Sequence, residues 1–452
     1  HIEVKISPKE KKFVQKPSLD PDTIFAELIK DLPPETERLA LEFKAFARAR
    51  KIKTVAELFR IVLLFAGLDQ SEREIAANLV LVNPEIESLS DQSVHGRLEA
   101  CLPWLKALLP KLIERAPLPA LPSGMRIVVI DASDITAPGQ TKVSWRVHLM
   151  LDLVSLQLIC VRLTDVHTGE TLINFDFQAG EVVLADRGYS HRKGVAHLIE
   201  SGGQPIVRYN PHHIPVEDRA GHSLNLAAAL SDCEPGETRT LQARFTAPNG
   251  KTYPVYIHAY RLSGAAAEAA RRRCRKGGKR GKYTPRQETL FLAEFVMVLT
   301  TIPPEVLSAE TVLALYRCRW QVELIFKHYK SLLDMDELRA RAKSPLGQVW
   351  LHGKLIYVCL IERRAINRCG PDWTSLDRER CGTWWRVWKI IKQELTPLIT
   401  LSQCWDLSAW PAALTALAER KRKRRLQSLP AEVVMWLRRP VEATGSILGN
   451  TV

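Results

Sequence analysis

The sequence lacks the short signatures that assign several common chemistries. It has no Gly-x-Ser-x-Gly and no Gly-x-Gly-x-x-Gly motif, and Gly278-Lys279 is followed by Arg without the earlier Gly that a Walker A loop requires. These absences argue against a serine hydrolase with a nucleophile elbow, a dinucleotide-dependent oxidoreductase and a P-loop nucleotide hydrolase. A requirement for ATP is therefore not expected.

Signs of disulfides, structural zinc and membrane spans are also missing. The nine cysteines form no Cys-x-x-Cys pair, and their odd number in a large chain predicts reduced thiols in a cytoplasm. Zinc is not expected, because the adjacent His212 and His213 have no Cys at ligand spacing. The most apolar stretches, 61–68 and 355–361, are far shorter than the roughly 20 residues of a membrane-spanning helix. We therefore expect a cytoplasmic protein with no membrane partner.

What the sequence has in excess is positive charge, and that charge is local. Lys and Arg number 64 against 50 Asp and Glu, which gives a formal charge of +14. Two basic runs, Arg271–Lys282 with eight cations and Arg420–Arg425 with six, account for the whole excess. Clustered cations gain most by displacing counterions from phosphate, so a nucleic acid is favoured as partner, although solvated tails would carry the same charge.

The first part of the chain has helical periodicity. Between residues 20 and 118, apolar residues recur at helical spacing, and Ser, Thr or Asp stands at several helix starts. A short helix from Ser71 and a second helix capped by Ser90 resemble a helix-turn-helix, but ordinary packing of two amphipathic helices explains the same pattern. This region is therefore a candidate DNA-binding region.

After a Pro-rich segment at 116–123 the periodicity becomes that of strands. Apolar, β-branched runs predict strands at 126–130, 145–152, 156–164, 181–185 and 205–209. A helix is predicted over 191–201, between the last two strands. From 210 to about 289 short alternating pieces predict a β-rich insertion that ends in the first basic run. Strand character returns at 290–301, a long helix follows Pro303-Pro304, and the rest of the chain is helical and rich in Trp.

Two carboxylates and one helix carry the chemistry. Asp131 and Asp186 each follow a predicted strand, which is where side chains of an α/β core meet at a cleft. In the helix over 316–330, Tyr316, Arg319, Glu323 and Lys330 fall within an arc of about 60°. Each feature alone is explained by turn caps or by a solvated helix face with an ordinary Arg–Glu pair.

Together these features are recognisable. The spacing Tyr-x2-Arg-x3-Glu-x6-Lys at 316–330 is similar to the signature of bacterial DDE transposases of the insertion-sequence-four type. Asp131-Ala132-Ser133 and Asp186-Arg187-Gly188-Tyr189 also resemble that family's two upstream motifs, in the same order, and the resemblance covers about residues 120–365. It implies an α/β fold with a ribonuclease-H-like mixed-sheet core, interrupted by the β-rich insertion and flanked by helical regions.

The periodicity along the chain and the resemblance together divide the chain into regions, and the resemblance implies a catalytic triad. The expected regions are 1–118, helical and DNA-binding; 119–209, first part of the core; 210–289, insertion; 290–369, second part of the core; and 370–452, helical with a possible role in dimerisation. The implied triad is Asp131, Asp186 and Glu323. Asp134 also follows the first strand, but the family motif places the ligand directly after that strand, so Asp131 is assigned.

The physical chemistry of the triad agrees with this implication. Three converging carboxylates repel one another, and two Mg²⁺ or Mn²⁺ ions with oxygen ligands would relieve the repulsion and serve an in-line displacement at phosphorus. Arg319 and Lys330 would hold phosphates, and Tyr316 and Arg187 are further candidate DNA contacts. The first basic run adds eight candidates: Arg271, Arg272, Arg273, Arg275, Lys276, Lys279, Arg280 and Lys282.

The implied function is that of a transposase. It would cut double-stranded DNA at terminal inverted repeats and join the ends to target DNA, working as a homodimer at the bacterial nucleoid. Studied relatives that form a DNA hairpin stack a base on a Trp of the insertion, but here no Trp lies between Trp145 and Trp320, and Tyr253, Tyr256 or Tyr260 would have to serve. Two alternatives remain: a nuclease without strand transfer, and an inactive sequence-specific DNA-binding protein.

Overall fold

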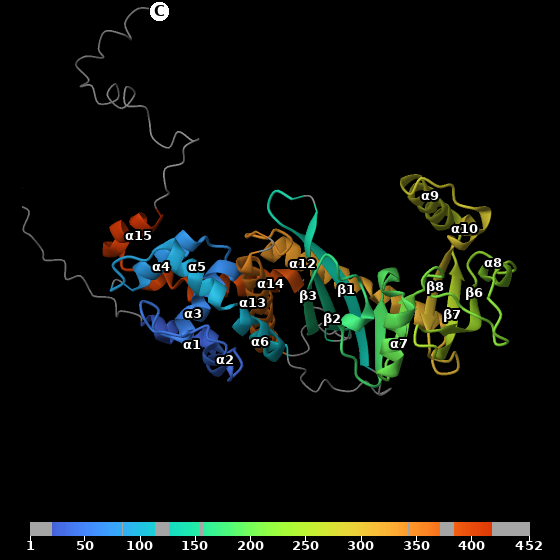
Figure 1. Ribbon diagram of the computed structural model, residues 1–452, viewed down its shortest axis with the longest axis horizontal. Coiled ribbons are helices and arrows are strands. Elements are labelled where there is room, and N and C mark those ends of the chain that lie inside the picture. Colours follow the sequence, from blue (N-terminus) through green and yellow to red (C-terminus); the bar gives the residue numbers. More distant parts are fainter. Residues whose placement is uncertain are drawn as a thin grey trace, which may run out of the picture.

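A single eight-stranded mixed sheet runs through the middle of the protein, with helices gathered at one end and an insertion at the other (Figure 1). The structure is a computed structural model. It describes residues 20–83, 85–113, 126–140, 142–153, 155, 157–341, 344–370 and 384–417. The second basic run, Arg420–Arg425, lies outside the described residues, as does the Pro-rich segment.

The sheet confirms the predicted mixed α/β core. Its order is β3-β2-β1-β4-β5-β8-β7-β6, in which β4 pairs in parallel with both β1 and β5, and the other neighbours are antiparallel. The strands are β1 (Arg126–Thr136), β2 (Val143–Asp152), β3 (Leu158–Asp165), β4 (Glu181–Ala185), β5 (Gln204–Arg208), β6 (Thr238–Thr246), β7 (Thr252–Arg261) and β8 (Phe295–Thr300). Helix α7 (Arg192–Glu200) links β4 to β5, as predicted.

Successive side chains of the central strands pack into two separate hydrophobic cores, one on each face of the sheet. Val129 and Leu184 pack into the cluster that holds the large helices, whereas Val128 and Val183 pack into a second cluster with α7. Because successive residues of a strand point to opposite faces, both faces of β1 and β4 are covered. This explains why residues 127–130 of β1 and 182–185 of β4 are apolar without alternation.

The N-terminal and C-terminal helices form one body. Two N-terminal helices begin with complete capping boxes, Thr54 with Glu57 and Ser71 with Glu74. The N-terminal elements are α1 (Pro21–Ile29), α2 (Thr36–Glu42), α3 (Val55–Val62), the π-helix η1 (Leu63–Gly67), α4 (Glu72–Val82), α5 (Asp91–Ala100) and α6 (Leu102–Leu112). They share a core with the long helix α13 (Pro345–Cys369) and with α14 (Trp384–Thr400), while α15 (Trp410–Leu417) packs on α4. The two helical regions, predicted apart in sequence, therefore pack together in space.

One Trp of the C-terminal region belongs to this core. Trp388 is 2% exposed and stacks on Tyr329, with ring centroids 5.5 Å apart. Packing in the helical core therefore accounts for this Trp. The side chains of Trp384 and Trp385 lie outside the described residues.

The insertion extends the sheet of the core. The hairpin β6–β7 pairs with β8, so its strands continue the same sheet, and α8 (Leu226–Ala229) lies near them (Figure 1). The first basic run lies on a helix, α9 (Gly264–Arg280), which the sequence pattern did not predict. The strand predicted over 290–301 begins only at Phe295, because residues up to Leu292 belong to α10 (Gln287–Leu292).

The long helix predicted after Pro303-Pro304 is divided. It consists of α11 (Ala309–Cys318) and α12 (Trp320–Leu333), with Arg319 between them at φ −51° and ψ −30°. The amide of Arg319 bonds the carbonyl of Tyr316, three residues back, so the chain tightens at this point without changing direction sharply. Among the described helices, none is long and apolar enough to cross a membrane.

Candidate active site

The two predicted aspartates lie where β1 and β4 separate. These parallel strands stay paired as far as Val129 and Leu184. Asp131 stands two residues beyond Val129, and Asp186 stands two residues beyond Leu184. Both aspartates therefore point to the same face of the sheet as Val129 and Leu184, which is the face that packs against the large helices. Asp131 does not end its strand as predicted, because β1 continues to Thr136 beside β2. The separation of the two strands, rather than a strand end, opens this edge.

Arg319 connects the helix signature to the first aspartate. Its guanidinium donates to Asp131 Oδ2 at 3.2 Å and to Glu323 Oε1 at 2.5 Å. Arg319 and Asp131 are both 16% exposed, whereas the side chain of Glu323 is 46% exposed. One cation thus lies between two of the three predicted carboxylates.

The three carboxylates are close enough to affect one another. Burial raises the pKa of Asp131 to about 6, the amide of Ala132 and the charge of Arg319 oppose that rise, and the charges of Asp186 and Glu323 add to it. Asp131 Oδ1 accepts the amide of Ala132 at 2.9 Å, and Asp186 Oδ1 accepts the amide of Gly188 at 2.7 Å. Each aspartate is therefore oriented by the backbone through one oxygen, and the second oxygen of Asp131 is the one that accepts from Arg319.

This donor set fits a divalent cation. All the side chains concerned offer carboxylate oxygens, and their mutual repulsion is the quantity that a hard cation relieves. In the described part of the chain no three His, Cys, Asp or Glu side chains stand in metal-binding geometry. The positively charged guanidinium of Arg319 lies between Asp131 and Glu323 and pairs with both.

The other predicted side chains lie around this edge. Tyr316 is half-buried, and burial raises the pKa of its hydroxyl, while the positive charges of Arg319 and Arg208 oppose the rise. Lys330 lines a narrow cleft together with Ser133 of β1. Arg187 is exposed and donates to Asn210 Oδ1 at 3.2 Å, so it lies at the rim of the site.

Asp134 is separated from the triad. It lies three residues past Asp131 on β1, so it faces the opposite side of the sheet, and it accepts a bond from Arg146 Nε at 2.8 Å. Because Asp134 has its own ion pair and points to the other face of the sheet, Asp131 is the better candidate for a site shared with Glu323.

Sequence reasoning missed Arg208, which ends β5 directly beside the second aspartate. In the parallel register Ala185 lies opposite Val207, so Asp186 and Arg208 are the next residues of neighbouring strands. Arg208 has no ion pair within the described residues and donates only to the carbonyl of Phe295 at 3.4 Å. Burial lowers its pKa, Tyr316 opposes the effect, and the positive charges of Arg187, Arg273 and Arg319 strengthen it. A charged residue at the end of an apolar strand was the signal that could have identified it.

Glu170 is a second residue that the sequence did not indicate. Burial raises its pKa, and the negative charge of Asp186 adds to the effect. A Cβ built on Gly188 would lie 2.0 Å from Glu170 Oε2. Gly188 does not have a positive φ, so its lack of a side chain serves this close approach rather than the turn.

The first basic run forms one cationic face of α9. At about 100° per residue, five of its exposed cations fall within about 120° of the helix surface. They are Arg272, Arg273, Lys276, Lys279 and Arg280. The opposite face buries Ala267, Ala270 and Gly278. The charge of Arg273 acts on Arg208, so this face extends toward the carboxylate edge.

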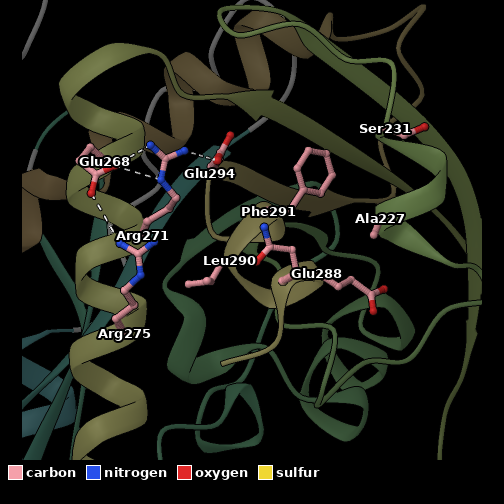
Figure 2. Close-up of a pocket in the computed structure, with 10 residues that line it drawn as sticks. Ala227, Ser231, Glu268, Arg271, Arg275, Glu288, Leu290, Phe291 and Glu294 are labelled. Atoms are coloured by element: carbon pink, nitrogen blue, oxygen red, sulfur yellow. Dashed lines mark hydrogen bonds and ion pairs between the residues drawn. The ribbon is translucent and has the colours of Figure 1, made fainter. Parts of the chain in front are cut away.

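Two cations of the run are paired with carboxylates. A cavity of about 710 Å³ between α8, α9 and α10 contains Arg271, which bonds Glu268 at 2.6 Å and Glu294 at 2.5 Å, and Arg275, which lies 3.6 Å from Glu268 (Figure 2). Glu294 is buried and also pairs with Arg261. Arg271 therefore anchors α9 to the sheet, which leaves the cationic face exposed.

Comparison with known proteins agrees with this arrangement. Residues 122–359 match the model of the family described as "Transposase DDE domain". The chain is 31% identical over 336 residues to the putative transposase InsL for insertion sequence element IS186A of Escherichia coli, covering 73% of this chain and 90% of that protein. It is equally 31% identical to the transposase for IS421 of Escherichia coli, and 28% identical over 137 residues to the transposase for IS231F of Bacillus thuringiensis, of which it covers 28%.

The sheet is mixed and carries carboxylates at its opened edge, and the family model matches more than half of the chain. These two findings define a DNA-processing enzyme with a ribonuclease-H-like core. The chain belongs to the DDE transposase family. It is therefore an enzyme that acts on DNA and depends on a divalent metal.

Proposed function

We propose that this protein carries out cut-and-paste transposition of an insertion sequence. It would cleave DNA at the terminal inverted repeats of its element and join the freed ends to target DNA. The relatives are named as transposases of insertion sequence elements, which supports this substrate. The observation that carries the proposal is the contact of Arg319 with both Asp131 and Glu323 at the edge where Asp186 also lies.

Asp131, Asp186 and Glu323 would hold two Mg²⁺ or Mn²⁺ ions. When bound, such ions supply charge neutralisation and activation of the attacking oxygen at a phosphodiester. Asp131 and Asp186 come from adjacent strands, and their backbone hydrogen bonds fix one oxygen of each. Glu323 comes from α12 and is the most exposed of the three, so it would complete the site from the side of the DNA.

The cations around the triad would position the phosphates. Arg319 would exchange a carboxylate for a phosphate as the DNA enters, because a guanidinium binds either anion through two N–H groups. Within the described residues Arg208 has no carboxylate partner, and it lies beside Asp186, so it would hold a phosphate of the same strand. Tyr316 and Lys330 would contact the flanking sugar and phosphate.

The bonds balance without a nucleotide cofactor. In the first step water attacks phosphorus, the P–O3′ bond breaks, and the products are a 3′-hydroxyl and a 5′-phosphate. In the second step that hydroxyl attacks a target phosphodiester, so one P–O bond forms as another breaks. This accounts for a sequence that lacks a nucleotide-binding loop.

The other regions would hold the DNA and the second subunit. The N-terminal helices would bind the terminal repeats, and α9 would track the backbone of the DNA that leaves the carboxylate edge. For the homodimer, exposed apolar side chains of the C-terminal helices support an interface, since Ile390 is 63%, Leu407 70% and Leu414 53% exposed. A protein with this substrate would act at the nucleoid.

Incubation of the protein and Mg²⁺ with DNA that carries the inverted repeats tests the proposal. Joined products support transposition. Cleavage without joining would favour a nuclease, and binding without cleavage would favour an inactive DNA-binding protein. A denaturing gel of the same reaction reveals whether a hairpin species forms.

A further inference from the structure

A third basic segment is hidden by the charge balance of the body of the protein. Residues 44–53, KAFARARKIK, contain five cations and no acid. They form the irregular connection between α2 and α3. Its cations do not form an uninterrupted run, because small and apolar residues separate them.

The segment forms one wall of a groove whose other wall is α5. The groove has a volume of about 590 Å³. Its cations are Lys44, Arg50, Lys51 and Arg97, of which the first three are exposed. Among the described residues that line it there is no carboxylate and no aromatic ring. Such a groove attracts a polyanion and offers no platform for stacking single-stranded bases.

Two of these cations hold the walls together through hydrogen bonds to backbone carbonyls. Lys51 donates to the carbonyl of Ser88, and Arg97 donates to the carbonyl of Arg48 at 2.9 Å. Neither side chain pairs with a carboxylate within the described residues, and the same holds for Lys44 and Arg50. Two of the four cations are therefore anchored to the backbone, and none of the four is neutralised by a carboxylate of the described residues.

Helix α5 has a buried side, a side that forms ion pairs and an exposed side. Val94 and Leu98 are buried, and the acidic side is occupied by partners, since Asp91 pairs with Arg73 at 3.2 Å and His95 pairs with Glu72 at 2.8 Å. The exposed side, which lines the groove, carries Gln92, Ser93, Gly96 and Ala100. Apart from Arg97 at its margin, this side has no charge and only short side chains beyond its first turn, so another molecule can approach it closely.

The chain that connects α4 to α5 differs from the predicted motif. It spans residues 83–90, whereas the turn of a helix-turn-helix has about three or four residues. Arg73 and Glu72 nevertheless fix α4 across α5. The two helices therefore stay packed on each other although the connection is longer than that of a helix-turn-helix.

We propose that this groove is the surface that reads the terminal repeats, with the exposed side of α5 in the major groove of duplex DNA. This inference rests on the proposed function, because it takes terminal-repeat DNA as the ligand. Lys44, Arg50, Lys51 and Arg97 contact phosphates on both sides of the helix. Gln92 and Ser93, in its first turn, reach the base edges, and a Gln side chain pairs with the N6 and N7 atoms of adenine.

The dimensions fit duplex DNA better than RNA. With its side chains an α-helix is about 10–12 Å across, so the major groove of DNA, about 12 Å wide, admits it, and the ten residues of α5 extend about 15 Å along that groove. The major groove of an RNA duplex is too narrow for a helix. A protein partner would be expected to meet apolar or aromatic side chains, which the exposed side of α5 lacks.

The test measures binding of the full chain to terminal-repeat duplex and to a scrambled duplex of equal length, at several salt concentrations. Arg50→Ala and Lys51→Ala should weaken binding to both duplexes and flatten log K against log salt by about 0.9 per residue. Gln92→Ala should leave the slope unchanged and lower the preference for the repeat about tenfold. Gln92→Glu keeps helix propensity and should lower affinity for both duplexes further.

Two exposed cations on neighbouring helices serve as controls. Lys30 and Arg38 pair with Glu27 and Glu42 and lie outside the groove, so their Ala variants should bind like the wild type. If the wild type cleaves repeat DNA while all groove variants keep its affinity, preference and salt slope, the inference is wrong and the proposed function stands. If the wild type binds selectively through the groove but does not cleave, the proposed catalysis is wrong and the inference stands. Equal affinity for an RNA duplex would also overturn the inference.

Discussion

Arg319 reaches from the α11–α12 junction to Asp131 on β1, and the two side chains lie 3.2 Å apart although 188 positions separate them in sequence. The same guanidinium holds Glu323, so one side chain sets the distance between a strand carboxylate and a helix carboxylate. Because a guanidinium and a divalent metal would compete for these oxygens, metal binding and DNA binding should be coupled through Arg319. Phosphate that draws Arg319 away would free the oxygens for metal.

The pH dependence of stability follows from Asp131. Its pKa of about 6 in the folded protein lies above its ordinary value of 3.8, so the folded state holds the proton more tightly. The group therefore stabilises the fold at low pH, and this contribution is lost as the pH rises from about 4 through about 6. In metal-free buffer Asp131→Asn should remove that loss and raise the free energy of unfolding at pH 7 by up to about 3 kcal/mol.

Denaturant unfolding between pH 4 and pH 8, in the presence of a chelator, measures this effect. Asp134→Asn, on the opposite face of the same strand, is the control. A wild-type curve that rises steadily through pH 6, with no gain for Asp131→Asn, would contradict the burial of an ionisable Asp131.

Two adjacent glycines of α9 should respond oppositely to Ala. A Cβ on Gly278 would lie 2.7 Å from both the carbonyl oxygen of Tyr283 and Cδ of Pro285, whereas nothing lies within 4 Å of a Cβ on Gly277. Gly278→Ala should therefore cost about 1–3 kcal/mol by overpacking, and Gly277→Ala should gain about 0.5–1 kcal/mol of helix stability. Thermal unfolding of both variants is the measurement, and equal effects would mean that α9 does not pack on the loop that follows it.

The cationic face of α9 should set part of the salt dependence of DNA binding. Replacing Arg272, Arg273, Lys276, Lys279 and Arg280 by Gln should lower the slope of log K against log salt by up to about four to five, at roughly 0.9 per phosphate contact. Arg275→Gln should have a smaller effect, because that side chain already lies beside Glu268. An unchanged slope in the fivefold variant would reduce the run to a solvated helix face.

The exposed C-terminal side chains should determine self-association. Ile390→Glu should weaken the dimer formed on terminal-repeat DNA at least tenfold, because a buried charge would replace an apolar contact. Sedimentation of the protein with and without DNA measures it. Val306→Glu, at an apolar side chain that is 60% exposed elsewhere, is the control. An intact dimer in Ile390→Glu would place the interface on another surface.

Much of the sheet was predictable because buried strands of this kind are apolar and β-branched along their whole length. The limits of β4 were predicted to the residue, and Asp186 directly after it followed from that. The helical state of α9 was not predictable, because Gly277, Gly278 and a high density of cations disfavour a helix locally. Packing of its small face against Tyr283 and Pro285 overrides that preference.

The candidate site was predictable where spacing reports a helix face, and not where it depends on neighbours in space. Arg319 and Glu323 could be paired from sequence because they are four residues apart. Arg208 could not be placed, because its position beside Asp186 depends on the parallel register of β4 and β5. The order of strands in a sheet is a tertiary property that local patterns do not carry.

The most direct test of the account is metal-dependent cleavage of terminal-repeat DNA by three variants, Asp131→Asn, Asp186→Asn and Glu323→Gln, with Asp134→Asn as the matched control. Each triad variant should lose at least about a thousandfold in cleavage while keeping DNA binding within about threefold, since removal of a reacting-centre interaction costs several kcal/mol of transition-state stabilisation. Asp134→Asn should cleave like the wild type. Loss of cleavage in Asp134→Asn together with retained cleavage in Asp131→Asn would contradict the assignment of the site.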